Sequence, residues 1–255
     1  MLTLYHWEPT LDSGEPLVCL KEKALEFESR YVDLLALEQH LPEFLALNPS
    51  GQVPVLVHDG RVLSETGLLL EYLDETFPDP PLAPSALPER YESGFWVKYA
   101  EERIAPYVAQ LGWHELVRPG LGRERLDCAR RGLAALPIER RRIWEQAIED
   151  DYSPETLTLA RDALGCATAA LERALERDRW LAGPTYSLAD ITLVFLARAM
   201  RVVTPQMVNR ERTPRTLEWL ARLEERRAVK ETLALARTPA PERMFAPGPE
   251  PPRWG

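Results

Sequence analysis

The sequence predicts an α/β domain followed by an all-helical domain. Short strand-like runs alternate with helical patterns over residues 1–80, whereas the apolar residues that follow recur at helical spacing with almost no alternation. A proline-dense segment separates the two patterns, as expected of a stiff extended linker. We therefore predict domains over residues 1–80 and 89–238, a linker over 81–88 and a proline-rich tail over 239–255.

In the first domain the expected order is βαβ, a short helix, then ββα. The cluster Asp12–Gly14 breaks the chain before the first helix, and Pro78 ends the last one. The turn at 58–61 (HDGR) joins two strands into a hairpin. The predicted strands cover 2–7, 27–34, 53–57 and 62–63. The apolar pattern of the first predicted helix begins near residue 17, and the other two predicted helices cover 42–47 and 64–77.

The second domain shows only helical periodicity. It is clearest over 89–111, 153–177, 187–200 and 213–235. The tail from residue 239 holds six prolines and few side chains that could pack, so we expect an extended strap or disorder there. The segment YSLADI contains Ser187 and Asp190 at the spacing of a helix capping box, for which we predict a structural role.

Composition favours a small-molecule ligand over a macromolecular one. The formal net charge of −9 disfavours nucleic acid and anionic membranes, both of which attract basic surfaces. The start of the chain does not resemble a secretory signal and no run approaches 18 apolar residues, so a cytoplasmic protein is expected. Cys19, Cys128 and Cys166 are odd in number and widely spaced, which predicts neither a disulfide framework nor a metal site, but buried small side chains.

The functional prediction depends on a motif in the first domain. The run NPSGQVPVL occupies 48–56, and SET follows at 64–66. This combination resembles the signature of the cytosolic glutathione transferase superfamily, whose first domain is thioredoxin-like. In that family the proline that opens the strand is cis, and the residue before it pairs with the cysteinyl backbone of glutathione. The resemblance gives these roles to Pro54 and Val53.

The same resemblance places the γ-glutamyl end of glutathione at Glu65 and Thr66. Thr66 and the first helical N–H groups can donate to the ligand's carboxylate, and Glu65 can pair with its ammonium. The alternative is that Ser64 or Glu65 only caps the helix. Other side chains match those that often reach the glycyl carboxylate, namely Gln39, His40 and Gln52, although solvated surface positions explain these three nearly as well.

Glutathione must lose its thiol proton to react, because a thiol with a pKa of about 8.5 is mostly protonated at neutral pH. Lowering that pKa by about two units requires roughly 2.7 kcal/mol of preference for the thiolate. A hydroxyl donor at the positive end of the first helix could supply much of it. We predict that Ser13 is this donor, with a plain helix cap as the alternative. Tyr5 and His6 are rivals that lie too early in the chain, and Asp12 is expected to point away, because its charge would oppose a thiolate.

A narrower resemblance covers nearly the whole chain. The segments EQHLPEF, NPSGQVP, VHDGRVLSET, EYLDETFP, LGWHE, LPIERRRIWEQ, YSLADI and RTPRTLEWL are similar to the bacterial lignin β-etherases. These glutathione transferases cleave β-aryl ethers. The resemblance implies that the protein is a dimer and that it acts on a small aromatic electrophile. The candidate pocket residues are Tyr107, Trp113, His114 and Trp144, although aromatic residues at such spacing are more often part of a core. Arg140, Arg141 and Arg142 are expected to form a solvated helix face.

The resemblance leaves alternatives open. A general conjugating or dehalogenating transferase, or an isomerase of maleyl-type acids, would carry the same glutathione motif. A binding or scaffold protein could have kept the fold without catalysis. The subunit arrangement is expected to be a homodimer, or a heterodimer with a homologous subunit.

Overall fold

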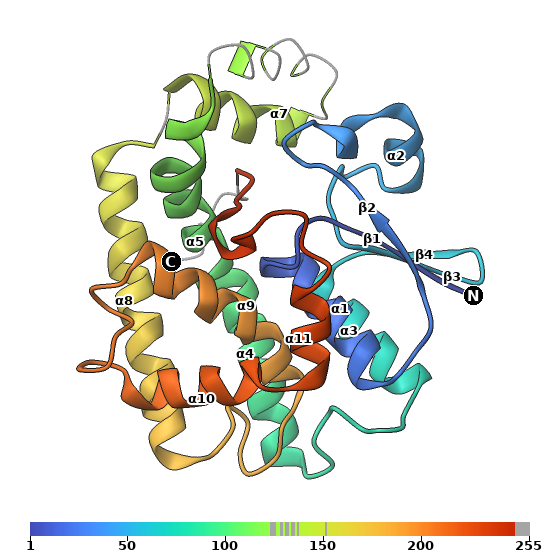
Figure 1. Ribbon diagram of the computed structural model, residues 1–255, viewed down its shortest axis with the longest axis vertical. Helices are drawn as coiled ribbons and strands as arrows, with labels where there is room; N and C mark the ends of the chain where they lie inside the picture. The colour runs from blue at the N-terminus through green and yellow to red at the C-terminus, as the bar shows by residue number, and fades with distance from the viewer. Residues whose placement is uncertain are drawn as a thin grey trace.

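A four-stranded mixed sheet organises the N-terminal part of the computed structural model (Figure 1). Its strand order is β2-β1-β3-β4, with β1 parallel to β2 and β3 antiparallel to both β1 and β4. The strands are β1 (Leu2–His6), β2 (Glu28–Tyr31), β3 (Val55–His58) and β4 (Arg61–Leu63). The structure describes residues 1–122, 126–127, 130, 133, 136, 138–150 and 152–247.

Helices cover both faces of this sheet. The helices α1 (Leu11–Glu22) and α3 (Thr66–Thr76) join the main core, which includes Leu4 and Leu56. On the other side, the 3-10 turn Glu38–His40 leads into α2 (Pro42–Leu47), where Phe44 packs in a smaller cluster. The order βαβ, helix, ββα is as predicted.

The first helix begins earlier than its apolar pattern predicted. Helix α1 starts at Leu11, and its first turns bury Ser13, Gly14 and Glu15, none of which belongs to an apolar stripe. Gly14 faces helix α9, where an added Cβ would lie 2.4 Å from the ring of Phe195. The start of α1 is therefore buried by the helical part of the chain and not by the sheet.

The rest of the described chain is helical. Its longer helices are α4 (Leu87–Arg103), α5 (Ala105–Gly112), α7 (Ile138–Glu145), α8 (Pro154–Arg177), α9 (Leu188–Val203), α10 (Pro214–Glu224) and α11 (Arg227–Leu233). Short irregular helices cover Trp113–Val117, Arg118–Gly120, Gln146–Asp150 and Pro241–Arg243. The pattern over 89–111 forms two helices because Pro106 supplies no backbone N–H, and the chain breaks at Ile104.

Helix α9 lies within the helical layer and is buried along most of its length. Ser187 and Asp190 form the predicted capping box at its start. The fully buried Asp190 carboxylate also accepts from Trp219 Nε1 at 2.7 Å and from Leu181 N at 3.1 Å. Burial raises the pKa of Asp190 to about 6. In the described part of the chain, no helix is both long enough and apolar enough to cross a bilayer.

A buried ion pair fastens the segment that joins the two parts. The Lys23 ammonium, at the end of α1, donates to Asp74 Oδ1 at 2.6 Å and to the carbonyls of Phe77 and Pro80 at 2.6 and 2.9 Å. Asp74 in turn accepts from the backbone N–H groups of Leu82 and Ala83 at 2.8 and 2.9 Å. Two charges thus hold the proline-rich segment against the first domain.

Of the two expectations for the C-terminal segment, the strap and not disorder describes its residues up to 247. The Phe245 ring is fully buried against Gly112, where an added Cβ would lie 2.4 Å from it. Further back, the Arg237 N–H donates to Glu8 at 3.0 Å and the Arg237 guanidinium lies 3.8 Å from the centre of the Tyr31 ring. We call residues 237–247 the strap, and this segment contacts both domains.

The described cysteines are unpaired. Cys19 is buried, and desolvation raises the pKa of its thiol to about 12. Cys166 is exposed on α8, contrary to the expectation that the cysteines are buried. Cys128 lies outside the described residues.

Candidate active site

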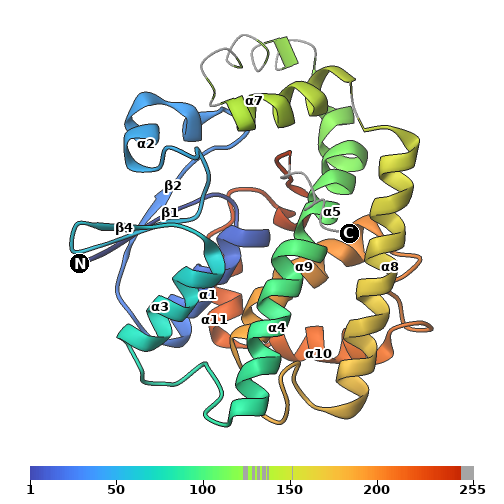
Figure 2. The same cartoon turned by 180° about the vertical axis from the view of Figure 1, so that it is seen from behind.

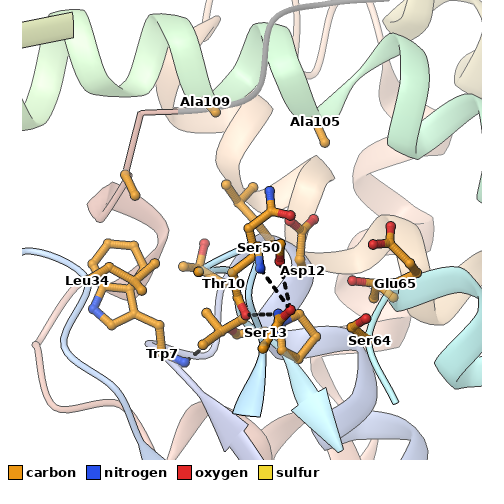
Figure 3. Close-up of a pocket in the computed structure, with 18 of the residues that line it drawn as sticks. Trp7, Thr10, Asp12, Ser13, Leu34, Ser50, Ser64, Glu65, Ala105 and Ala109 are labelled. Atoms are coloured by element: carbon orange, nitrogen blue, oxygen red, sulfur yellow. Dashed lines mark hydrogen bonds between the residues drawn. The ribbon is translucent and has the colours of Figure 1, made fainter. Parts of the chain in front are cut away.

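A cleft with a cavity volume of about 280 Å³ lies between the two parts of the chain (Figure 3). Its floor is the start of α1 and the loop before β3, and α4, α5 and the strap supply the opposite wall. The lining residues are Trp7, Thr10, Leu11, Asp12, Ser13, Leu34, Asn48, Ser50, Gly51, Gln52, Val53, Pro54, Ser64, Glu65, Thr66, Glu101, Ala105, Ala109, Ala246 and Pro247. Predicted site residues from three separate segments therefore meet in one cavity, namely Ser13, Gln52, Val53, Pro54, Glu65 and Thr66.

Ser13 sits on the cavity floor in the first turn of α1. Its Oγ accepts a hydrogen bond from the Trp7 backbone N–H at 3.1 Å, which fixes the hydroxyl in place. A serine oxygen that accepts from a backbone N–H still carries its own proton, so the hydroxyl can donate to a ligand. Because the first N–H groups of a helix carry partial positive charge, the position favours an anion.

The loop before β3 is held by Asn48. Its Oδ1 accepts from the Ser50 hydroxyl at 2.9 Å, and its Nδ2 donates to the Gln52 carbonyl at 2.9 Å. The Val53–Pro54 peptide bond that follows is cis, as predicted. Both residues border the cavity.

At the start of α3, Glu65 has a φ of 68°, a backbone conformation that non-glycine residues rarely adopt. Its side chain is exposed to the cleft, and Thr66 opens the helix beside it. Sequence reasoning missed a third group here. Glu101 of α4 accepts from the Gly67 N–H at 2.9 Å and so occupies the N-terminus of α3 from the opposite domain.

Asp12 faces the cavity, which corrects the prediction that it points away. The second position of α1 is turned toward the helical part of the chain and not toward the sheet (Figure 3). Asp12 is exposed to the cleft, yet the protein packed around it desolvates its carboxylate. This desolvation and the nearby carboxylates of Glu101 and Glu65 raise the pKa of Asp12 to about 6. The pKa of Glu101 is also raised, first by desolvation.

Gln39 and His40 are buried beneath the cleft rather than on its wall. Gln39 Nε2 donates to the Leu34 carbonyl at 3.3 Å. His40 packs under Gly51, where an added Cβ would lie 2.8 Å from the imidazole ring. The 3-10 turn that carries both residues directs them inward, so in this structure they support the loop that borders the cavity.

The rival residues for thiol activation lie elsewhere. His6 is 1% exposed, and its two ring nitrogens lie 2.5 Å from the Trp7 carbonyl and 2.7 Å from the Ser29 hydroxyl. Burial lowers the pKa of His6. Tyr5 packs edge-on against Phe44 on the other face of the sheet.

The aromatic candidates of the helical part form a core cluster. Trp113 and Trp144 are 1% and 2% exposed, with ring centres 5.8 Å apart, and Trp113 Nε1 donates to the Ala147 carbonyl. Tyr107 packs against the main core and His114 is half-buried. None of these four residues is among the described residues that border the cavity. The two indole rings instead fill the space between helices.

Arg141 also departs from its prediction. It is half-buried and donates to the Leu133 and Leu136 carbonyls at 3.1 and 3.3 Å, so it organises its own turn instead of a solvated face. Arg142 is exposed as expected, and the side chain of Arg140 lies outside the description.

Comparisons with known proteins agree with this architecture. The family model for the N-terminal domain of glutathione S-transferases matches residues 14–76, and the model for their C-terminal domain matches residues 138–227. The chain is 33% identical to protein LigF of Sphingobium sp. over 90% of its own length and 92% of that relative. The chain belongs to the glutathione S-transferase family, whose members use glutathione as their cosubstrate.

Solved structures extend the likeness. The crystal structure of the β-etherase LigF from Sphingobium superposes with a TM-score of 0.83 at 32% identity, covering 91% of this chain and 98% of that one. A glutathione transferase homologue from Sulfitobacter, solved with bound glutathione, has a TM-score of 0.68 at 22% identity, with coverage of 91% and 96%. The second comparison supports the fold alone.

Proposed function

We propose that this protein is a glutathione-dependent β-etherase. The thiolate of glutathione attacks the carbon that bears the aryl ether of an aromatic ketone, a C–S bond forms, and the C–O bond breaks to release a phenolate. The single observation that carries the proposal is the anchored Ser13 hydroxyl on the floor of a two-domain cleft, in a chain that resembles a β-etherase along nearly its whole length.

In this proposal Ser13 stabilises the thiolate. Its oxygen already accepts from Trp7, which leaves the hydroxyl proton to donate to sulfur. The partial positive charge at the start of α1 adds to this preference. Together they lower the thiol pKa toward neutrality, and a larger fraction of bound glutathione is then nucleophilic at pH 7.

The remaining parts of glutathione fit the other cleft segments. The backbone of Val53, which borders the cavity, can pair with the cysteinyl unit, and Gln52 can reach the glycyl end. The γ-glutamyl end meets Thr66 at the start of α3, where Glu65 and Glu101 can pair with its ammonium. These assignments need no metal ion.

The electrophile would occupy the opposite wall. Ala105 and Ala109 present small side chains on that wall and leave room for an aromatic ring. Trp7, Leu34 and Pro247 add apolar surface elsewhere around the cavity. The ketone next to the reacting carbon makes that carbon more electrophilic. A cleft that holds the ring and ketone in one orientation aligns one enantiomer for attack opposite the leaving oxygen.

We further propose that the protein works as a dimer in the cytoplasm. Helices α3 and α4 contact each other (Figure 2), and each carries exposed large apolar side chains, namely Leu68 on α3 and Tyr91 and Phe95 on α4. Exposed apolar side chains on two neighbouring helices are typical of a subunit interface. The described cysteines are unpaired, which fits a reducing compartment.

The test is incubation of a racemic β-aryl ether ketone with excess glutathione. Phenol release should stop near half conversion, because the pocket aligns one enantiomer, and the thioether product should be inverted at the attacked carbon. Chiral chromatography of the remaining ether measures both. Conjugation of a generic aryl halide without any phenol release would instead identify a general transferase, and failure to bind glutathione in calorimetry would identify a non-catalytic relative.

A further inference from the structure

One carboxylate in the cleft has no role in the scheme above. Asp12 directly precedes Ser13 in the first turn of α1 and borders the same cavity. In the close-up it points from the Ser13 side of the cleft toward α5, which carries Ala105 and Ala109 (Figure 3). It therefore lies between the expected position of the sulfur and the expected position of the electrophile.

The charges around Asp12 make an ionised carboxylate unfavourable beside a thiolate. Glu65 and Glu101 face it from the start of α3 and from α4. Asp12 in turn helps to raise the pKa of Glu15, which is buried on α1. Among the described residues that line the cavity there is no lysine or arginine. A glutathione thiolate would add a further negative charge, so Asp12 and the sulfur should not both be ionised at once.

Moving the thiol proton onto Asp12 removes this conflict. The pair then carries one negative charge instead of two, and the proton remains inside the cleft instead of entering solvent. The raised pKa of Asp12, about 6, is suited to this exchange, because a group that takes up and returns a proton works best with a pKa near the working pH.

We propose that Asp12 is a catalytic proton carrier, which takes the proton of the glutathione thiol and delivers it to the departing phenolate oxygen. This inference rests on the proposed β-ether cleavage. In the first step the S–H proton passes to an Asp12 oxygen while Ser13 stabilises the sulfur anion. In the second the C–S bond forms, the C–O bond breaks with its electron pair on oxygen, and the Asp12 O–H proton goes to that oxygen. Glutathione and ether thus become thioether and neutral phenol, and Asp12 returns to its carboxylate form.

The first experiment compares leaving groups in Asp12→Asn, which keeps the shape of the side chain but cannot carry the proton. With a β-ether of an unsubstituted phenol, whose pKa is near 10, kcat should fall by about a hundredfold, within the range for removal of a general acid–base group. With a nitrophenol ether, whose anion leaves without a proton, the loss should shrink to a few-fold. An equal loss for both ethers, or a rate that stays the same or rises, would overturn the proposal.

The second experiment does not need an ether substrate and so separates this inference from the proposed function. Glutathione is mixed with the protein at pH 7 in a weak buffer, the thiolate is followed by its ultraviolet absorbance, and released protons are followed with an indicator dye. The wild-type protein should release well under one proton for each thiolate formed, whereas Asp12→Asn should release close to one. Equal release by the two proteins would refute a role for Asp12 as the proton acceptor, even if phenol is produced.

A matched control is Asp162→Asn on α8, where the side chain is exposed and lies outside the cavity lining. This variant should match the wild-type protein in both experiments. Thermal unfolding and the glutathione Kd of Asp12→Asn should also remain close to wild-type values, because Asp12 is open to the cleft. If the wild-type protein releases no phenol but still retains the proton, the β-etherase proposal fails while the proton acceptor stands.

Discussion

Replacing Lys23 with methionine should destabilise the protein more than the loss of an ion pair on the surface would. The side chain of Lys23 is fully buried and that of Asp74 is 9% exposed, with 2.6 Å between Nζ and Oδ1. Methionine fills much of the same space but removes the charge. Asp74 would then keep only its two backbone donors, and the carbonyls of Phe77 and Pro80 would lose their charged partner.

The expected magnitude follows from these partners. Removing one member of a buried ion pair typically costs about 3–5 kcal/mol, and the retained N–H groups of Leu82 and Ala83 place Asp74 toward the lower end of that range. We therefore expect a loss of about 3–4 kcal/mol. For a chain of this size, roughly 2–4 °C of Tm corresponds to each kcal/mol, so Tm should fall by about 6–16 °C. Urea unfolding followed by tryptophan fluorescence gives the free energy directly.

The control is Lys230→Met on α11, which removes a contact of 2.5 Å to Glu225 between two exposed side chains. Exposed pairs contribute at most about 1 kcal/mol, so this variant should change little. In the double variant Lys23→Met with Asp74→Asn, the unpaired charge is also removed, and the loss should be smaller than the sum of the two single losses. A loss for Lys23→Met no larger than that of the control would refute the reasoning.

Four further predictions concern the site and the helical part. Ser13→Ala should lower turnover by roughly ten- to a thousandfold in steady-state kinetics, with little change in glutathione affinity by calorimetry, because the hydroxyl acts on the thiolate. Glu65→Ala should raise the glutathione Kd by about ten- to a hundredfold in calorimetry, since it removes one charged hydrogen bond worth about 1.5–3 kcal/mol. Phe245→Ala should reduce stability by about 3–5 kcal/mol in urea unfolding and make the strap sensitive to proteolysis, because the ring is fully buried. Asp190→Asn should remove a pH dependence: the pKa of Asp190 is higher in the folded protein than in the unfolded chain, so its contribution to stability is complete below about pH 4 and is lost as pH rises through about 6. Relative to the variant, the wild-type protein should therefore lose roughly 2–3 kcal/mol in unfolding experiments between pH 4 and pH 7.

Local patterns predicted most of the elements because each is specified by neighbouring residues. The helix 42–47 and the cis bond at Pro54 are cases where the signal lies within a few residues of the element. The start of α1 was predicted too late because Gly14 and Glu15 are buried by α9 from the other domain. The packing of Phe245 was missed for a similar reason, since Gly112 is distant in sequence.

In the cleft, too, residues within short motifs could be predicted, whereas residues placed by distant parts of the chain could not. Ser13, Glu65 and Thr66 could be found because each belongs to a short motif, and the structure brings them together with Val53. The opposite wall comes from small side chains on α5, and nothing in an alanine-containing helical pattern distinguishes a wall from a core. Aromatic residues were preferred as pocket candidates, but Trp113 and its neighbours are large enough to be needed between helices.

The strap has a consequence for biosynthesis. Trp7 and Pro247 border the same cavity, so two of its sides come from segments that are far apart in the sequence. A ribosome delivers the N-terminal end first, and the small sheet and its helices can form while the rest is still being made. The wall to which Ala246 and Pro247 contribute can be completed only after residue 247 has left the ribosome. A nascent chain can thus form the start of α1 and the loop before β3 early, but it completes the cleft only once these later residues have been added.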